Sequence, residues 1–226
     1  MYRFQHDPKV SYFFSGEFYA YRSLFEEFCP PPMKMEKGMR ICRHGLTKNW
    51  MYYLCKGTLK VYVENLTGNE RIVALLGEDT IAGIDCFLPD TASLMTIECT
   101  SDCWLMPFLN TTLEAMMRKS PEFSVELARY YCKVMRQLCF DATNQSIGSV
   151  FIRLANFLQA NWDDKNNCRV LLSQQDLAAA VNCSRTSVAR ACKIMKEEGV
   201  ISIEGIGFRI LDFSNLETLC RKYSHL

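Results

Sequence analysis

The 226-residue chain has little of what a metal centre, a membrane span or a polycationic tail requires. It contains only three histidines, and none of its twelve cysteines falls in a Cys-x-x-Cys motif, so a zinc or iron–sulfur framework has little support. No apolar run approaches the ~18–20 residues that cross a bilayer. The balance of 26 Lys and Arg against 25 Asp and Glu excludes a nonspecific polycation. We therefore expect no metal, no cofactor and no membrane contact.

The composition is that of a chain that folds around a core. Its hydrophobic share is 49% and its aromatic share 12%, which excludes global disorder. The N-terminal sequence MYRFQHDPKV contains no apolar signal segment. Because free thiols persist in reducing compartments, we expect a cytoplasmic protein whose cysteines are mostly small buried side chains.

The first third of the chain has the pattern of short β-strands. Between residues 38 and 83, apolar runs are separated by glycines, with turns predicted at 56–57 and 65–68. Leu59, Val61 and Val63 alternate with their neighbours at the period of a half-buried strand. Many short strands with glycine turns indicate an antiparallel barrel or jelly roll.

From about residue 110 the pattern changes to helix. A short helix is predicted over 110–119, and a longer one from Pro121 to about Asn144, with a break near 147–148. One stripe of the longer helix, at alternating four- and three-residue spacing, consists of Phe123, Leu127, Tyr130, Val134, Gln137 and Asp141, with Leu138 beside it. The stripe suits two structures equally, a dimer seam or a helix packed on its own β domain. A third helix is predicted to about Trp162, followed by a polar turn over 163–167.

The most informative segment is LSQQDLAAAVNCSRTSVARACKIMKEEGV, residues 172–200. Ser173 and Asp176 have the spacing of a helix capping box. Asn182 suits the left-handed backbone of a tight turn between helices, and Ser184 can cap the second helix. Apolar side chains of the second helix recur at helical spacing, namely Val188, Ala191, Cys192 and Met195. The pattern predicts a helix-turn-helix.

The second helix of this motif is basic. Residues 184–196 contain four Lys or Arg and no acid, although the whole chain has a net charge of only +1. Arg side chains pair bidentately with guanine in the major groove, whereas Ser and Lys suit phosphates. Two short strands predicted over 200–212 add a β wing that can lie along the DNA backbone. The predicted DNA-contacting residues are Ser173, Gln174, Ser184, Arg185, Thr186, Ser187, Arg190 and Lys193. The alternative is an ordinary helix pair with a solvated basic face.

These motifs resemble those of the CRP/FNR superfamily of bacterial transcription regulators. MEKGMRICRHG (35–45) is similar to the opening of the family's β-roll, and YYLCKGTLKVYVEN (52–65) to its next element. NCSRTSVARACKIMKEEGVIS (182–202) resembles its recognition helix. The resemblance implies an α+β fold with three parts: a β-roll (jelly-roll, cyclic-nucleotide-binding-like) effector-sensing domain over 1–120, a long dimerisation helix over 121–146, and a winged helix-turn-helix DNA-binding domain over 147–226.

The resemblance also implies partners. It implies a homodimer on palindromic double-stranded DNA, contact with RNA polymerase, and a small-molecule effector bound between roll and helix. It favours a dimer seam formed by Phe123, Leu127, Tyr130, Val134 and Leu138.

One departure from the family pattern affects DNA specificity, because Thr186 stands where the family usually carries Glu. Glu accepts a hydrogen bond from cytosine N4, whereas Thr presents a methyl group. We therefore expect a half-site related to the family's TGA-type core, with one base altered.

The effector is not predicted to be a cyclic nucleotide. Ile84 replaces the Glu of the family's G-E-[LI] element, and Ala92 stands before Ser93 where an Arg grips the phosphate. An iron–sulfur sensor of this family would need a cluster of N-terminal cysteines, which this sequence lacks. A haem sensor would need an axial ligand near the pocket, for which His44 and Cys86 are the only rough candidates.

Another branch of the family fits better. IAGIDCFLP (81–89), ECTSDCW (98–104), and Tyr130 with Lys133 resemble regulators of halorespiration, which sense halogenated aromatic acids. An apolar pocket with one Lys suits an aromatic carboxylate or phenolate. The expected effector-pocket residues are Ala74, Gly83, Ile84, Asp85, Ser93, Met95, Tyr130, Lys133 and Val134. Lys133 could instead be solvated or paired with a neighbouring acid.

Two other interpretations stay open. A thiol-redox regulator would use Cys132, Cys183 or Cys192, which lie near basic residues in the sequence. A ligand-binding interaction protein would use its C-terminal domain to contact protein rather than DNA. An enzyme is not expected, because the sequence has no nucleophile–base pair, Gly-rich phosphate loop or metal motif.

Overall fold

The computed structural model describes residues 10–47, 50–64, 70–88, 91–161, 172–204 and 207–223. The predicted turns at 65–68 and 163–167, and the tip of the predicted wing, lie outside these residues. The described chain forms two compact units. One is Phe13–Val134, and the other joins residues 10–12 to the described residues from Met135 onward.

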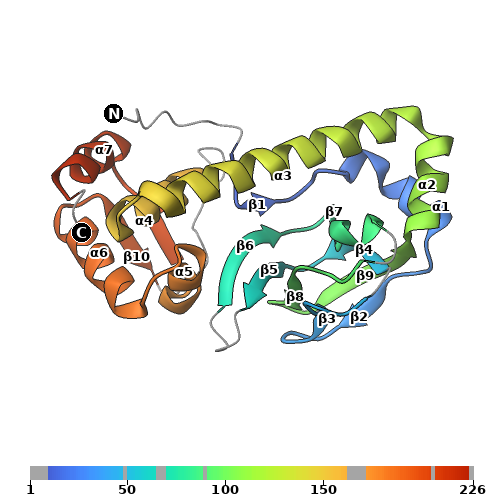
Figure 1. Ribbon diagram of the computed structural model, residues 1–226, viewed down its shortest axis with the longest axis horizontal. Coiled ribbons are helices and arrows are strands. Elements are labelled where there is room, and N and C mark those ends of the chain that lie inside the picture. Colours follow the sequence, from blue (N-terminus) through green and yellow to red (C-terminus); the bar gives the residue numbers. More distant parts are fainter. Residues whose placement is uncertain are drawn as a thin grey trace. The chain divides into compact units, whose positions relative to one another are not determined.

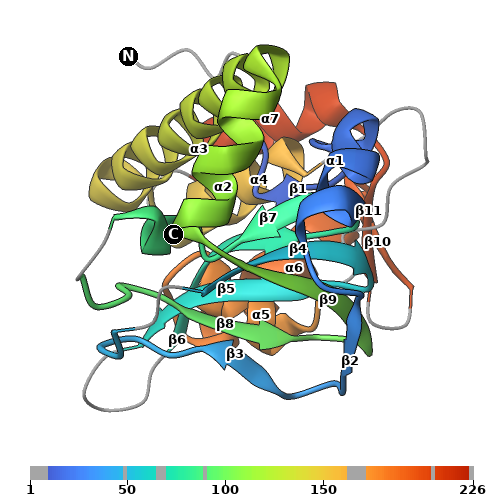
Figure 2. The same ribbon diagram turned by 90° about the vertical axis from the view of Figure 1, so that its right-hand side faces the viewer.

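The first unit is built on two β-sheets (Figures 1 and 2). One sheet has the order β1-β6-β5-β8-β3 and the other β2-β9-β4-β7. All pairs are antiparallel except β1 with β6. The strands are β1 (Phe13–Phe14), β2 (Met33–Met35), β3 (Arg40–Cys42), β4 (Trp50–Lys56), β5 (Leu59–Glu64), β6 (Glu70–Leu76), β7 (Thr80–Ala82), β8 (Thr96–Cys99) and β9 (Cys103–Leu109). The predicted roll of short strands is confirmed.

Short helices accompany the sheets: η1 (Tyr19–Tyr21), α1 (Arg22–Phe28), η2 (Ile84–Phe87) and α2 (Asn110–Lys119). The predicted helix over 110–119 is α2, whereas α1 was not predicted. The Arg22 guanidinium lies 2.7 Å from the Asp79 carboxylate, which also accepts a 2.6 Å hydrogen bond from the Tyr53 hydroxyl. Asp79 itself has a left-handed backbone, with φ of 59°. These contacts hold the start of α1 against the two sheets.

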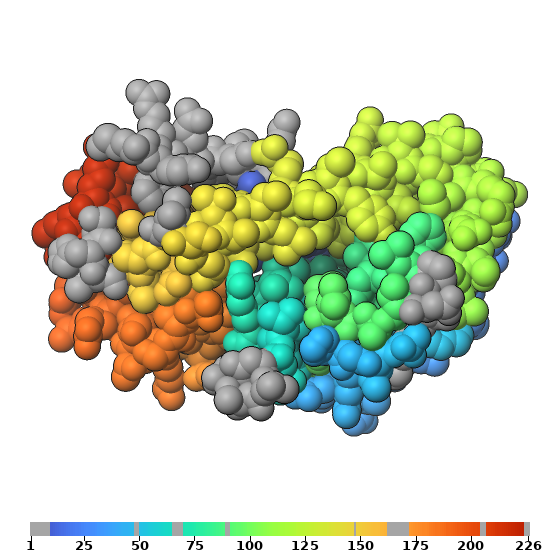
Figure 3. Space-filling view, in the orientation of Figure 1, coloured from blue at the N-terminus to red at the C-terminus, as the bar shows by residue number. Residues whose placement is uncertain are grey.

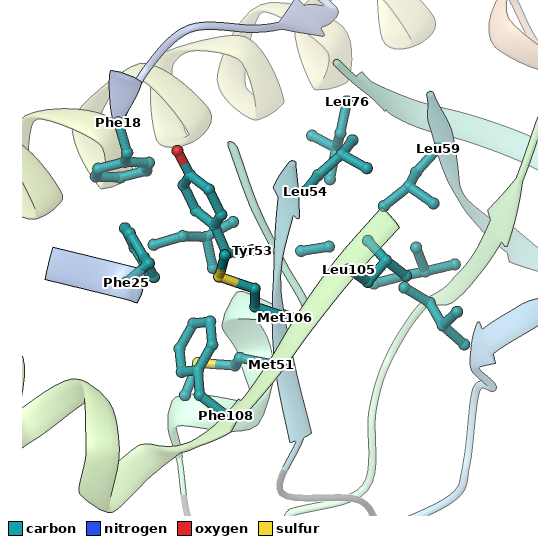
Figure 4. Close-up of a cluster of buried hydrophobic side chains, with 14 of the residues drawn as sticks. Phe18, Phe25, Met51, Tyr53, Leu54, Leu59, Leu76, Leu105, Met106 and Phe108 are labelled. Atoms are coloured by element: carbon teal, nitrogen blue, oxygen red, sulfur yellow. The ribbon is translucent and has the colours of Figure 1, made fainter. Parts of the chain in front are cut away.

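Aromatic rings from several elements meet in the core of this unit (Figure 4). The Phe25 ring of α1 stacks on the Tyr53 ring of β4, with centroids 4.1 Å apart. The Phe108 centroid lies 5.7 Å from that of Phe25. The N-terminal segment therefore belongs to the core, because it supplies rings that the strands alone do not provide.

Helix α3 (Pro121–Ile147) is one continuous helix of 27 residues (Figure 1). Phe123, Leu127 and Tyr130 are at most 3% exposed. The Phe123 centroid lies 5.7 Å from that of Phe18, and the Tyr130 centroid 5.6 Å from that of Phe14. The predicted dimer seam is therefore wrong for these three residues, which pack on their own β domain. Val134 is half-buried and Leu138 is exposed.

The second half of the same stripe is polar and also buried. Gln137, Asp141 and Asn144 are at most 5% exposed. The Tyr12 hydroxyl donates a 2.8 Å hydrogen bond to Asp141, and the Asn156 side-chain amide a 2.7 Å bond to the Asn144 side chain. The stripe turns polar here because its partners change from aromatic rings to hydrogen-bonding side chains.

The second unit contains the remaining elements. They are α4 (Val150–Ala160), α5 (Gln174–Ala180), α6 (Arg185–Glu197), β10 (Ile201–Glu204), β11 (Gly207–Ile210) and α7 (Phe213–Lys222). The predicted break follows α3, at Gly148, where an added Cβ would lie 2.6 Å from the Asn144 carbonyl oxygen. The predicted helix-turn-helix and the two wing strands are confirmed, whereas α7 was not predicted. Within the described residues, no helix is long and apolar enough to cross a membrane.

Candidate functional site

Side-chain caps fix where α5 and α6 begin. The Ser173 hydroxyl accepts a 3.1 Å hydrogen bond from the Asp176 amide, and the Asp176 carboxylate accepts one of 3.3 Å from the Ser173 amide. This is the predicted capping box. Asn182 has a left-handed backbone, with φ of 50°, as the tight turn requires. Ser184 caps α6 by accepting a 3.2 Å hydrogen bond from the Ser187 amide.

The two faces of α6 differ in chemistry. Val188, Ala191, Cys192 and Met195 are at most 5% exposed and anchor the helix to its own domain. Arg185, Thr186, Arg190 and Lys193 are exposed. Lys193 lies 3.7 Å from Glu197, but both side chains are largely solvated, so this pair restrains the lysine only weakly. The exposed face is therefore cationic and is held by a packed inner face.

Hydroxyl groups cluster at the start of α6. The Ser184 hydroxyl lies 2.9 Å from the hydroxyls of both Thr186 and Ser187. The Thr186 hydroxyl is therefore engaged within the chain, and its methyl group is the branch without such a contact. Ser184 is exposed, and Ser187, Ser173 and Gln174 are half-buried. The predicted DNA-contacting residues thus lie on α6 and at the beginning of α5.

The wing follows α6 directly. Strands β10 and β11 are antiparallel, with Ile201 opposite Ile210 and Glu204 opposite Gly207. The Leu211 amide donates a 2.7 Å hydrogen bond to the Val200 carbonyl, which closes the base of the hairpin. Glycine at 199, with φ of 71°, lets the chain leave α6 and enter the wing.

The predicted effector residues all lie in the first unit, on β6, η2, the β8 approach and α3. Gly83 caps η2 with a left-handed φ of 79°, and an added Cβ would lie 3.1 Å from the Trp50 carbonyl oxygen. Ser93 and Tyr130 are buried, whereas Ala74, Ile84, Asp85, Met95, Lys133 and Val134 are half-buried. Ala74, Ile84, Met95 and Val134 pack against the core of this unit.

The Asp85 carboxylate accepts the hydrogen bonds of two polar donors beside η2. The Ser93 hydroxyl donates a 2.8 Å hydrogen bond to Asp85, and the Leu94 amide donates one of 3.2 Å to the same oxygen. Ser93 is 3% exposed and Asp85 is half-buried, so this hydrogen bond is partly shielded from water. An anionic ligand at Ser93 would have to displace Asp85.

Helix α3 also contacts η2 through Tyr131, which was not predicted as a site residue. The Tyr131 hydroxyl donates a 3.3 Å hydrogen bond to the Ile84 carbonyl, and burial raises the Tyr131 pKa to about 12. The Tyr130 hydroxyl reaches the Ile81 carbonyl at 3.5 Å. Nothing in the sequence distinguished Tyr131 from its neighbour, because the contact depends on the folded position of η2.

Lys133 is not the isolated cation that an anion site would need. Its ammonium group lies 2.5 Å from the Glu17 carboxylate, and its side chain is 43% exposed. Glu17 lies 116 residues away in sequence, which is why the pairing could not be predicted. The interpretation in which Lys133 pairs with an acid is the one that the structure bears out.

The cysteines differ in accessibility. Of the eleven that the structure describes, Cys132 and Cys139 are exposed, Cys183 is half-buried and Cys192 is buried. Burial raises the pKa of Cys192 to about 12 and also raises that of Cys183. Cys86, the haem candidate, is buried against Cys42, which raises its pKa. No group of three or more His, Cys, Asp or Glu within the described residues could hold a metal ion.

A β-roll, a long helix and a winged helix-turn-helix together define the class of effector-responsive, DNA-binding transcription regulators. Comparison with known families agrees: residues 152–219 match the Crp-like helix-turn-helix domain, and residues 32–120 match the cyclic nucleotide-binding domain. The chain belongs to the CRP/FNR superfamily of transcription regulators, which are not enzymes.

Individual relatives are distant in sequence. The chain is 25% identical to the cAMP-activated global transcriptional regulator CRP of Pasteurella multocida over 164 residues, which cover 69% of this chain and 78% of that protein. It is 22% identical to the Anaerobic regulatory protein of Bacillus subtilis over 198 residues, which cover 83% of each.

Solved structures share the fold. One is the c-di-GMP-responsive global regulator CLP of Xanthomonas campestris, with a TM-score of 0.72, 16% identity, and 86% of this chain and 99% of that chain covered. Another is CprK complexed with OCPA, with a TM-score of 0.72, 15% identity, and 88% and 93% covered. At these identities the likeness establishes the fold and leaves the ligand open.

Proposed function

We propose that this chain acts in the cytoplasm as a homodimer that binds a palindromic DNA site and controls transcription in response to a small organic effector other than cAMP. In this proposal residues 1–120 sense the effector, 121–146 form the dimer and 147–226 bind DNA. The observation that carries it is the cationic exposed face of α6, capped at Ser184 and anchored by a packed inner face.

On DNA, α6 would enter the major groove. Arg185 and Arg190 are the residues that read base edges, since a guanidinium can pair bidentately with guanine. Ser184, Ser187 and Lys193 on α6 would contact phosphates, as would Ser173 and Gln174 at the start of α5. Two copies would place their α6 helices about one helical turn apart, ~34–36 Å, which matches a palindromic site.

The dimer contact would be the exposed stripe of α3. Its members recur every three and four residues, the spacing of a coiled-coil seam. Val125 is 51% exposed and Met135 62% exposed, although both are apolar. Figure 3 shows α3 on the surface along most of its length. We define this seam stripe as Val125, Ala128, Cys132, Met135, Cys139 and Ala142. Leu138, which is 42% exposed, would flank the stripe.

The effector would be a small, mainly apolar organic molecule bound near η2 and α3. Two observations favour this class over a cyclic nucleotide. Ala92 supplies no cation for a phosphate, and Asp85 already holds the Ser93 hydroxyl and the Leu94 amide. Lys133, paired with Glu17, offers little net charge to an anion. Proteins with this fold are associated with different molecules, since CLP is c-di-GMP-responsive and CprK is complexed with OCPA, so the fold alone does not select one.

The switch would be a shift in population between dimer geometries. A ligand beside η2 would act on α3 through the contacts of Tyr131 with Ile84 and of Tyr130 with Ile81. Binding would favour the arrangement in which both α6 helices fit successive major grooves, because a ligand shifts an equilibrium only by its differential affinity. The DNA-bound dimer would then contact RNA polymerase.

The proposal is tested by selecting DNA from a random pool with the purified full-length protein. The expected product is a pair of inverted half-sites about ten base pairs apart, centre to centre. Single or direct half-sites would contradict the two-fold dimer.

A thermal-shift screen with cyclic nucleotides, aromatic acids and halophenols tests which effector binds, because a ligand of the native state raises the melting temperature.

A further inference from the structure

Two cysteines of the seam stripe differ from the other described thiols. Cys132 and Cys139 are seven residues apart on α3 and are the exposed ones among the eleven described cysteines. Burial raises the pKa of Cys29, Cys192 and Cys220 to about 12. Cys103, whose pKa is lowered to about 7 by a hydrogen bond with Cys99, is fully buried. Because an oxidant must reach the sulfur atom, oxidation should favour the exposed pair.

A two-fold parallel dimer places each seam residue opposite the same residue of its partner. Helix axes in contact lie about 8–10 Å apart. With Cα atoms about 2.3 Å from each axis, facing Cα atoms lie roughly 3.4–5.4 Å apart. A disulfide needs about 4.4–6.8 Å between its Cα atoms, which axes about 9–10 Å apart provide. Ala128 and Ala142, the small neighbours of the two cysteines on the stripe, leave room for the two helices to come into contact.

The apolar character of the stripe favours a second copy of this chain as the occupant. The exposed charged side chains near it, Arg129 and Arg136, lie beside the stripe and not within it. Arg129 is 3.2 Å from Glu126 of its own helix, which offsets its charge. A parallel dimer therefore requires no like charges to face each other across the centre of the seam.

We propose that Cys132 and Cys139 are redox-active seam thiols, each able to form a disulfide with the same residue of a second copy. The inference rests on the proposed homodimer. The oxidant is a small disulfide such as oxidised glutathione. In a dissociated chain, where the stripe is exposed, one cysteine attacks the oxidant as the thiolate, releases one thiol and becomes a mixed disulfide. The partner cysteine then displaces the second thiol, so that two protons and two electrons pass from the protein to the oxidant. Once formed, the cross-link keeps the two copies together when the protein is diluted.

The test is a titration of the reduced full-length protein with oxidised glutathione, read on a non-reducing gel. Wild type should shift to a covalent dimer that dithiothreitol reverses. Cys132→Ser and Cys139→Ser should each still form the dimer, whereas the double variant should lose it. Cys183→Ser is the matched control on another element and should behave as wild type. Linked peptides containing residue 132 or 139 should appear by mass spectrometry.

Sedimentation in excess reductant separates this inference from the proposed function. A reduced dimer that does not cross-link would overturn the redox-active seam and leave the homodimer standing. Cross-linking of the double variant at the wild-type level would also overturn it, since other cysteines would then be responsible. A reduced monomer at micromolar concentration would overturn the homodimer and the cross-link together.

Discussion

The hydroxyl groups of Ser184 and Thr186 lie 2.9 Å apart at the first turn of α6. The Thr186 hydroxyl, which could otherwise contact a base, is therefore hydrogen-bonded to Ser184, the residue that caps the helix. Where many family members offer a carboxylate to cytosine N4, this chain offers a methyl group, which suits contact with thymine. The local hydrogen bond therefore has a consequence for the DNA sequence that the protein reads.

Replacing Thr186 by Glu should restore preference for cytosine at the base that residue 186 contacts. We expect a change in discrimination of about 1–3 kcal/mol at that position and little change elsewhere in the half-site. The measurement is selection of DNA from a random pool by both proteins. Thr186→Ser, which removes only the methyl group, should weaken thymine preference without creating cytosine preference. Identical preferences for wild type and T186E would show that residue 186 does not read a base.

Two apolar residues of α3 should behave differently when shortened. Leu127 is 3% exposed in the core of its own domain, so Leu127→Ala should lower the free energy of unfolding by about 2–5 kcal/mol. Met135 is 62% exposed, so Met135→Ala should leave unfolding of the monomer nearly unchanged but weaken dimerisation. Urea unfolding and sedimentation equilibrium measure the two quantities. Loss of dimerisation with L127A at unchanged stability would return that residue to the seam.

The Glu17–Lys133 ion pair predicts how the effector region responds to anions. Glu17→Gln removes the carboxylate that neutralises Lys133, so the variant should bind an aromatic carboxylate more tightly than wild type. Adding Lys133→Met should cancel that gain. Because Lys133 is 43% exposed, each single change should cost less than about 1 kcal/mol of stability. Calorimetric titration with the same carboxylate provides the test, and equal affinities for all three proteins would mean that Lys133 lies away from the ligand.

Cyclic AMP should not stabilise the protein. Asp85 holds the Ser93 hydroxyl at 2.8 Å, and an added phosphate would meet that carboxylate without a compensating cation at Ala92. A ligand at about 100 times its Kd contributes about 2.7 kcal/mol to the native state, which raises Tm by several degrees. We expect no saturable rise in Tm with cAMP. A saturable rise would show that the pocket rearranges around Asp85.

Much of the fold could be predicted from the sequence because its signals are local. Ser173 with Asp176, Asn182 and Ser184 act within a few residues of their hydrogen-bond partners, and all four have the predicted roles. The same holds for the break at Gly148 and for the wing strands.

The errors lie where a residue's role depends on distant partners. Phe123 satisfies a coiled-coil spacing and a packed-helix spacing alike, and only the ring of Phe18 decides between them. Lys133 meets Glu17 across 116 residues. Helix α1 was missed because its stability comes from contacts such as Arg22 with Asp79, and not from a helical pattern of its own.

The central claim is that α6 reads DNA. The most direct test measures how tightly the Arg185→Ala and Arg190→Ala variants bind DNA. Their affinities are compared on the selected palindrome and on a scrambled duplex, over a range of salt concentrations. Each variant should lose about 1–3 kcal/mol on the palindrome and much less on the scrambled duplex. Lys193→Ala should instead weaken binding to both duplexes and lower the salt slope by roughly one, because one phosphate is no longer neutralised. If the double arginine variant binds the palindrome with wild-type affinity and an unchanged salt slope, α6 does not read DNA and the C-terminal domain serves another partner.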